Sequence, residues 1–228
     1  MDGDAPGGVF TLDHDTFEPQ GRWEADRGPQ RLHYDFWWHL GHDTMITSEW
    51  ATPNQIEPGP SLELLTGRGY GHRLHVWDLT KRRHLQEIDL GDRHQMALEL
   101  RPAHDPTRTY GFVNTVVDVE DLSSNIFTWY LEDGVWKARK TITIPAEPAD
   151  PELLPEPLKQ FGAVPPLVSD ISLTLDDRIL LVSAGAPESS GAYDVSDPVR
   201  PPADRVEVRI AGGSSARRHI TGRPGPGA

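Results

Sequence analysis

Short runs rich in Val, Ile, Thr and aromatic residues recur along the chain between Gly, Pro, Asp and Asn. Such runs are typical of β-strands, and no stretch longer than about a dozen residues keeps the 3.6-residue apolar period of a helix. The pattern therefore predicts an all-β fold. Two short helical segments, at 61–66 and 151–160, are expected inside Pro-rich connections.

The strands repeat in units. The second half of each unit is a strand, a polar turn and a second strand, found at 75–90, 127–144 and 192–210. Trp77, Trp129 and Tyr193 occupy equivalent positions, and another pair of strands precedes each hairpin. Recurring four-stranded antiparallel units are typical of β-propeller blades, which bury their faces by stacking. A β-sandwich with appendages is the alternative, but the equal offset of the hairpins favours a propeller.

The repeat divides the whole chain. The predicted segments are the last strand of a preceding blade at 1–12, a connection at 13–31, blades at 32–90 and 91–144, a Pro-rich loop at 145–166, a blade at 167–211 and a disordered tail at 212–228. Strands are expected at 32–38, 43–50, 71–78 and 83–89; at 96–101, 109–117, 124–131 and 135–144; and at 167–175, 178–184, 190–195 and 205–210. Three blades are fewer than a closed propeller needs, so the chain is interpreted as part of one.

Composition narrows the function classes. A formal net charge of -13 opposes nucleic acid phosphates and anionic lipids, so neither nucleic acid nor membrane is expected as a partner. With 0 Cys, disulfides, zinc–thiolate sites and thiol nucleophiles are excluded. The first residues have neither a basic region nor an apolar region typical of a signal peptide, and we expect a cytoplasmic protein.

The first strand of each predicted blade carries one acidic residue: Asp35, Glu99 and Asp170. If the blades are equivalent, these carboxylates face the central channel at similar depth. Carboxylates brought together can bind a hard cation or raise one another's pKa. Alternatively, they pair with Arg101, backbone amides or water and hold the blades together. The sequence leaves both interpretations open.

Histidines supply the candidate metal ligands. His39 and His42 lie beside Trp37 and Trp38 and offer imidazole nitrogens to Cu or Zn, although a solvent-facing turn explains them equally simply. His104 follows an inner strand, where it can bind a metal, line the channel or stabilise a turn.

Three further patterns receive structural interpretations. His72 and His75 fall on opposite faces of one strand and are expected to be packing residues. Asp176 and Asp177 are expected to cap amides of a tight hairpin turn. Five tryptophans are expected between stacked blades rather than in a ligand cleft: Trp23, Trp37, Trp38, Trp50 and Trp136.

Several long strings in the chain closely resemble the selenium-binding protein family, whose members include copper-dependent methanethiol oxidases. These strings are YDFWWHLGHDTMITSEWATPN, YGHRLHVWDLTKRRHLQEIDLG, LELRPAHDPTRTYGFV, ITIPAEPADPELLP and LVSDISLTLDDRILLVS. The resemblance runs from about Gly7 to about Gly213. It implies a seven-bladed propeller in the complete family, of which this chain is a truncated member covering the middle blades.

The resemblance also implies a function. In the complete family, a small thiol, methanethiol, is oxidised by dioxygen to formaldehyde, hydrogen peroxide and hydrogen sulfide at a copper centre. Selenium is a candidate ligand of this chain, and the sequence does not decide whether it binds. The family's copper-binding histidines are expected in blades outside this chain, while His104 matches a position where relatives also carry His. We therefore expect this chain alone to be inactive, to bind no copper tightly, and to self-associate through exposed blade faces. The alternative is a non-catalytic propeller scaffold that binds protein partners.

Overall fold

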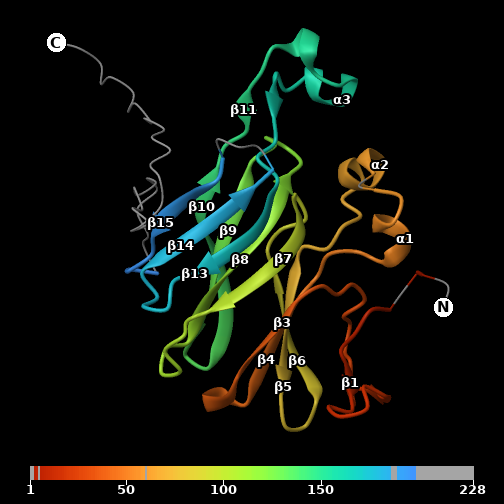
Figure 1. Cartoon of the computed structure of the whole chain (residues 1–228), viewed down its shortest axis with the longest axis vertical. Helices are drawn as coiled ribbons and strands as arrows, with labels where there is room; N and C mark the ends of the chain where they lie inside the picture. The colour runs from red at the N-terminus through yellow and green to blue at the C-terminus, as the bar shows by residue number, and fades with distance from the viewer. Residues whose placement is uncertain (1–2, 5, 60, 186–188, 199–228) are drawn as a thin grey trace.

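The computed structural model describes residues 3–4, 6–59, 61–185 and 189–198. Antiparallel sheets dominate it (Figure 1). The first large sheet contains β3 (Phe36–His39), β4 (Thr44–Ser48), β5 (Arg73–Asp78) and β6 (Arg83–Asp89). The second contains β7 (His94–Pro102), β8 (Tyr110–Asp118), β9 (Ser124–Glu132) and β10 (Val135–Ile144). The third contains β13 (Val168–Leu173), β14 (Ile179–Ala184) and β15 (Gly191–Asp194).

Each large sheet follows the chain in simple order, with neighbouring strands paired antiparallel. This up-and-down order is that of propeller blades, so the predicted partial β-propeller is confirmed. The strands lie within the predicted segments 32–90, 91–144 and 167–211. The fourth strand predicted for the last blade, at 205–210, and the tail at 212–228 lie outside the described residues.

Large aromatic residues anchor the blades at equivalent positions. Trp77, Trp129 and Tyr193 lie on β5, β9 and β15, the third strand of each sheet, and all three are buried. One apolar cluster fills the space between the first two blades and includes Ile46 and Leu100. A second joins the next pair of blades. The blades are therefore held by side chains between their faces, as stacking predicts.

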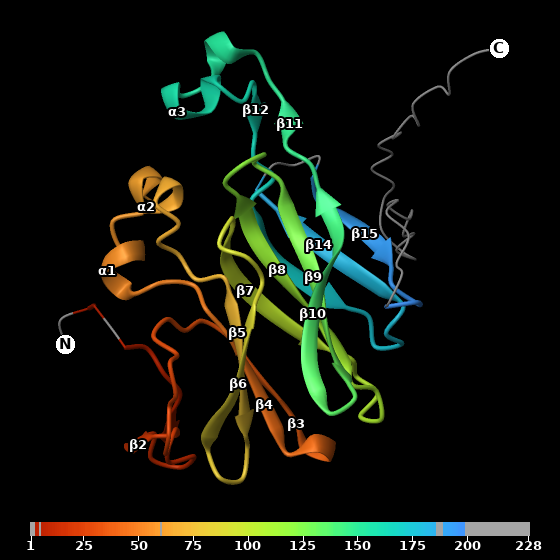
Figure 2. The same cartoon turned by 180° about the vertical axis from the view of Figure 1, so that it is seen from behind.

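The segments between blades carry more structure than the sequence predicts. β1 (Phe10–Leu12) pairs with β2 (Pro19–Arg22), which lies inside the predicted connection at 13–31. The predicted loop at 145–166 contains β11 (Glu147–Pro148), η2 (Pro151–Leu153), α3 (Glu156–Lys159) and β12 (Ala163–Val164). β11 and β12 pair with each other, and this arm projects beyond the sheets in both views (Figure 2).

Short helices join β4 to β5. α2 (Leu62–Thr66) begins after Ser61, whose hydroxyl accepts a hydrogen bond from the Leu64 amide, and it falls at the predicted helical segment. α1 (Pro53–Ile56) is absent from the sequence-based prediction; it is a single turn that begins with Pro at its first position. A 3-10 turn, η1 (Leu40–His42), joins β3 to β4.

Candidate functional site: a carboxylate cluster and an adjoining cavity

Arg101 gathers the three candidate carboxylates from three blades. Its guanidinium lies 3.4 Å from Asp35 Oδ2, 2.5 Å from Glu99 Oε2 and 3.2 Å from Asp170 Oδ1. Glu99 and Arg101 share one face of β7 because side chains alternate along a strand. The structure thus brings Asp35, Glu99 and Asp170 together, and it does so in the paired arrangement that the sequence left as an alternative.

Burial and hydrogen bonds set the electrostatics of this cluster. Burial raises the pKa of Asp35; the charge of Glu99 adds to the effect, whereas amides of Leu100 and Phe36 and the Arg101 charge oppose it. Burial and the hydrogen bond from Tyr34 Oη to Glu99, 2.9 Å long, raise the pKa of Tyr34 to about 12. Tyr34 therefore remains a hydrogen-bond donor at neutral pH, a role that no sequence motif signalled.

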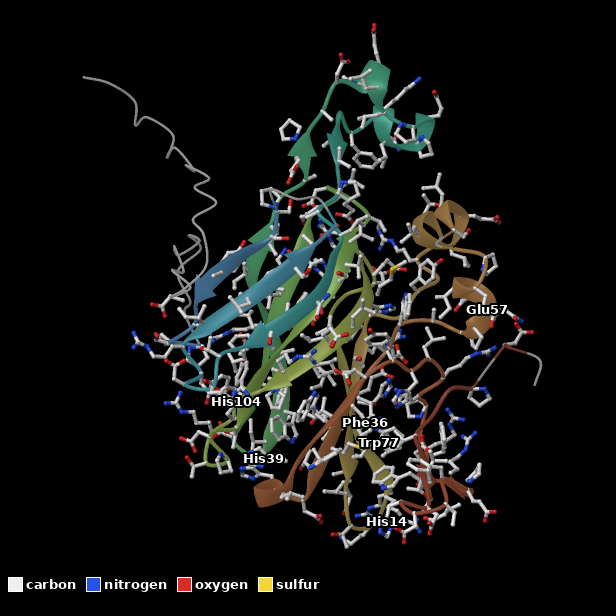
Figure 3. The ribbon with its side chains drawn as sticks, in the orientation of Figure 1. His14, Phe36, His39, Glu57, Trp77 and His104 are labelled. Atoms are coloured by element: carbon white, nitrogen blue, oxygen red, sulfur yellow. The ribbon has the colours of Figure 1, made fainter. Side chains whose placement is uncertain are left out.

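A cavity of about 500 Å³ adjoins the cluster. Arg101, His39 and His104 line it, so three of the candidate site residues share one space. Its apolar wall consists of Trp37, Trp38, Leu40, Pro102, Ala103, Pro106 and Leu173. Figure 3 shows His104 and His39 near each other at the lower left of the molecule, and His14 at the bottom, to the right of them.

The expectation that Trp37 and Trp38 pack between blades is wrong, because Trp37 is 39% exposed and Trp38 is 49% exposed.

Asp177 orients His104. The buried Asp177 carboxylate accepts hydrogen bonds from the His104 amide (2.8 Å), the Asp105 amide (3.2 Å) and His104 Nδ1 (2.9 Å). Burial pushes the pKa of Asp177 upward, but these hydrogen bonds outweigh it and hold the pKa below its usual value. An ionised carboxylate only accepts, so Nδ1 of His104 carries a proton, and in the neutral imidazole Nε2 is then an acceptor.

The sequence pattern assigns both Asp176 and Asp177 to their own hairpin turn, but only Asp176 plays that part. Asp176 Oδ1 accepts hydrogen bonds from Thr174 Oγ1 and the Arg178 amide, whereas Asp177 reaches into the neighbouring blade. The sequence held one sign of this contact: the turn contains two consecutive Asp residues, although one is enough to cap its amides.

The remaining two histidines differ in their surroundings. His39 Nε2 lies 3.1 Å from the carbonyl oxygen of Arg108, to which it can only donate, and its Nδ1 is buried without a hydrogen-bond partner. His42 is exposed and lines a different cavity beside Trp136. The His39 and His42 rings contact each other at a centroid distance of 4.7 Å.

The described residues do not fit a copper site. The Arg101 guanidinium already engages one oxygen of each carboxylate in the cluster, and carboxylate oxygens suit Mg or Ca better than Cu(I). Among the described residues, one group brings three ligand atoms within 4.8 Å of one another: Asp13, His14 and Asp15, on an exposed turn. Its Asp13 Oδ1 already accepts hydrogen bonds from the Asp15 and Thr16 amides.

Within the described part of the chain, no helix has the length and apolar character needed to cross a membrane.

Known proteins resemble this chain over most of its length. The family model for the 56 kDa selenium binding protein matches residues 1–225. Methanethiol oxidases from Xenopus tropicalis and Homo sapiens are each 38% identical over 200 residues, which is 87% of this chain and 40% of each relative. Selenium-binding protein 2 from Mus musculus is 36% identical over 202 residues, or 88% of this chain and 40% of the relative. The chain thus spans about 40% of the length of these relatives.

Solved structures agree with this match. A hypothetical selenium-binding protein from Sulfolobus tokodaii has a TM-score of 0.80 and 51% identity, over 87% of this chain and 43% of that one. A periplasmic gluconolactonase from Pseudomonas aeruginosa, with a TM-score of 0.55 and 13% identity over 87% of this chain and 49% of that one, shares the fold alone. Given the family match, the identities and the shared structure, the chain belongs to the 56 kDa selenium-binding protein family.

Proposed function

We propose that this chain is the thiol-binding part of a methanethiol oxidase and that, by itself, it binds a small thiol without oxidising it. The relatives named methanethiol oxidase support the substrate class. The observation that carries the proposal is the Asp177–His104 pair at the wall of an apolar cavity.

The cavity suits a small neutral thiol. Trp37, Trp38 and Leu40 offer apolar surface to a methyl group, and His104 Nε2 can accept a hydrogen bond from a sulfhydryl group. Three carboxylates against one guanidinium leave the neighbouring cluster negative when they are ionised, which disfavours a thiolate beside it. A thiol with a pKa of roughly 8.5 or above enters mainly in its neutral form at pH 7.

Oxidation of the thiol by dioxygen needs a redox-active group, and we propose that the residues of this chain do not hold one tightly. The resemblance implies copper, which transfers electrons between thiol and dioxygen when bound. Soft ligands such as thiolates favour Cu(I), and the sequence contains 0 Cys. Because the cluster's oxygen atoms are engaged by Arg101, we propose that copper is not bound tightly here.

Nitrogen-detected NMR of the histidine side chains tests thiol binding. Methanethiol is expected to shift the Nε2 resonance of His104 saturably, while leaving His42, outside the cavity, unchanged. The variant His104→Gln is expected to weaken binding about threefold to tenfold, since it loses one neutral hydrogen bond.

Two controls accompany this titration. Dimethyl sulfide, which has no sulfhydryl donor, should bind more weakly than methanethiol, and His42→Gln should bind like the unaltered chain. Equal affinity of His104→Gln and the unaltered chain for methanethiol, or no response at His104, would refute the thiol-binding proposal.

A further inference from the structure

The cavity beside the Arg101 cluster is much larger than methanethiol. Its volume is about 500 Å³. An apolar cavity of roughly 150 Å³ is enough to bind benzene, and methanethiol, a methyl group on a sulfur atom, is smaller still. Methanethiol held at His104 would therefore leave most of this space unfilled.

The first strands of the three blades build this cavity together. Trp37 and Trp38 come from β3, Pro102 comes from β7 and Leu173 comes from β13. His104 lies in the loop that follows β7 and lines the same space. The wall is therefore apolar and aromatic, with a hydrogen-bonding group at the loop.

The β3 side of the cavity contacts the loop that carries His104. His39 Nε2, at the end of β3, lies 3.1 Å from the Arg108 carbonyl oxygen. A Cβ atom at Gly41, in the turn that follows, would lie 3.6 Å from the carbonyl oxygen of Pro106. Because the two walls meet, one ligand of moderate size can contact the indole surface and His104 at the same time.

The groups that would meet such a ligand are accessible. The side chain of His104 is 42% exposed, and Trp37, Trp38 and Leu40 are exposed as well. The rings of Trp37 and Trp38 contact each other at a centroid distance of 6.2 Å and an interplanar angle of 40°. They form a continuous aromatic surface, on which a further aromatic ring can pack favourably.

We propose that this cavity prefers arylalkyl thiols to methanethiol, with the aromatic ring against Trp37 and Trp38 and the sulfhydryl group on His104 Nε2. The inference rests on the proposed thiol-binding function and names the class of thiol that fits the space. Pockets of this volume that bind small molecules typically combine apolar and aromatic walls with a few polar groups.

Benzyl mercaptan is the probe, and the tryptophan fluorescence of the dilute full chain measures its affinity. It should bind about tenfold to a hundredfold more tightly than methanethiol, because its phenyl ring removes additional apolar surface from water. Benzyl methyl sulfide, which keeps the ring but has no sulfhydryl donor, should bind more weakly than benzyl mercaptan.

Two variants remove apolar surface from the cavity wall. Trp38→Ala and Leu40→Ala should each weaken benzyl mercaptan binding about threefold or more, and should change the affinity for methanethiol less. Leu40 is exposed, so Leu40→Ala keeps the test valid if Trp38→Ala disturbs β3. Leu153→Ala, at an exposed leucine outside the cavity, is the matched control and should bind both thiols like the unaltered chain.

Equal affinities for the two thiols, or an affinity ratio that neither cavity variant changes, would overturn this inference. The histidine resonances distinguish that failure from failure of the proposed function. If methanethiol still shifts the Nε2 resonance of His104, only the preference for arylalkyl thiols is wrong, whereas no response at His104 to either thiol would refute thiol binding itself.

Discussion

At the scale of single residues, Asp177 connects stability and site geometry. One carboxylate of the third blade takes three hydrogen bonds from the second, at His104 and Asp105. The same contacts fix the proton of His104 on Nδ1. A residue that joins two blades therefore also determines which nitrogen faces the cavity.

Asp177→Asn is expected to lower the free energy of unfolding by about 1–3 kcal/mol at neutral pH, because a neutral amide replaces a charged acceptor of buried donors. Urea unfolding monitored by fluorescence measures this. Asp176→Asn, in the same turn but exposed, should have a smaller effect. Equal effects of the two variants would mean that the contact to His104 adds no stability.

The pH dependence follows from the same residue. Its pKa is lower in the folded chain than the unfolded value of roughly 3.9. Its contribution to stability is therefore fully present above that unfolded value and is lost as pH falls through the folded pKa. When unfolding is measured from pH 6 down into the acid range, the free energy of unfolding should fall less steeply for Asp177→Asn than for the unaltered chain. Parallel plots of this free energy against pH would contradict the role assigned to ionised Asp177.

At the scale of elements, close packing of β8 on β9 constrains the second blade. A Cβ atom at Gly111 would lie 2.1 Å from Cζ2 of the buried Trp129 and 2.7 Å from the Pro102 backbone. Neither the indole nor the backbone can move without disturbing the apolar cluster between the first two blades. Gly111 therefore sets how closely the ring of Trp129 approaches the strand.

Gly111→Ala is expected to destabilise the chain by about 1–3 kcal/mol through overpacking. Gly185→Ala, where a Cβ atom would make ordinary contacts of 3.5 Å or more, serves as the control and should be nearly neutral. Thermal unfolding compares the two. An unchanged midpoint for Gly111→Ala would show that the ring of Trp129 is free to shift.

Local patterns predicted the strands and helix α2 well, because alternation and capping depend on neighbouring residues. The Arg101 cluster could also be predicted from the sequence, because equivalent positions in repeated blades lie close together around the central channel. The contact of Asp177 with His104 could not be predicted in this way, because it joins residues from two blades through an irregular turn. The prediction for Trp37 and Trp38 failed because apolar side chains on both faces of a strand usually indicate burial, whereas β3 is an edge strand of its sheet.

At the scale of the whole molecule, β3 leaves a large aromatic surface open. Phe36 and Trp38 stack on each other at a centroid distance of 5.8 Å, and Leu40 at its end is 76% exposed. β3 also presents unpaired backbone groups along its free edge within the described sheet. Such an edge favours association.

We predict that the chain self-associates in a concentration-dependent manner and that Trp38→Lys shifts the equilibrium toward monomer. Analytical ultracentrifugation measures both effects. Leu153→Lys replaces another exposed apolar residue, on the projecting arm, and controls for the added charge. A monomer at all concentrations would contradict the prediction.

For the molecule as a whole, we propose that this chain provides the thiol pocket but not the metal of a methanethiol oxidase. Methanethiol-dependent release of peroxide by the purified chain, equilibrated with copper and then desalted, tests it most directly. We predict sub-stoichiometric copper and no peroxide above a control with the same copper in buffer. Tight one-to-one copper with peroxide release that His104→Ala or Glu99→Ala abolishes would contradict the account and place the oxidase site within these blades.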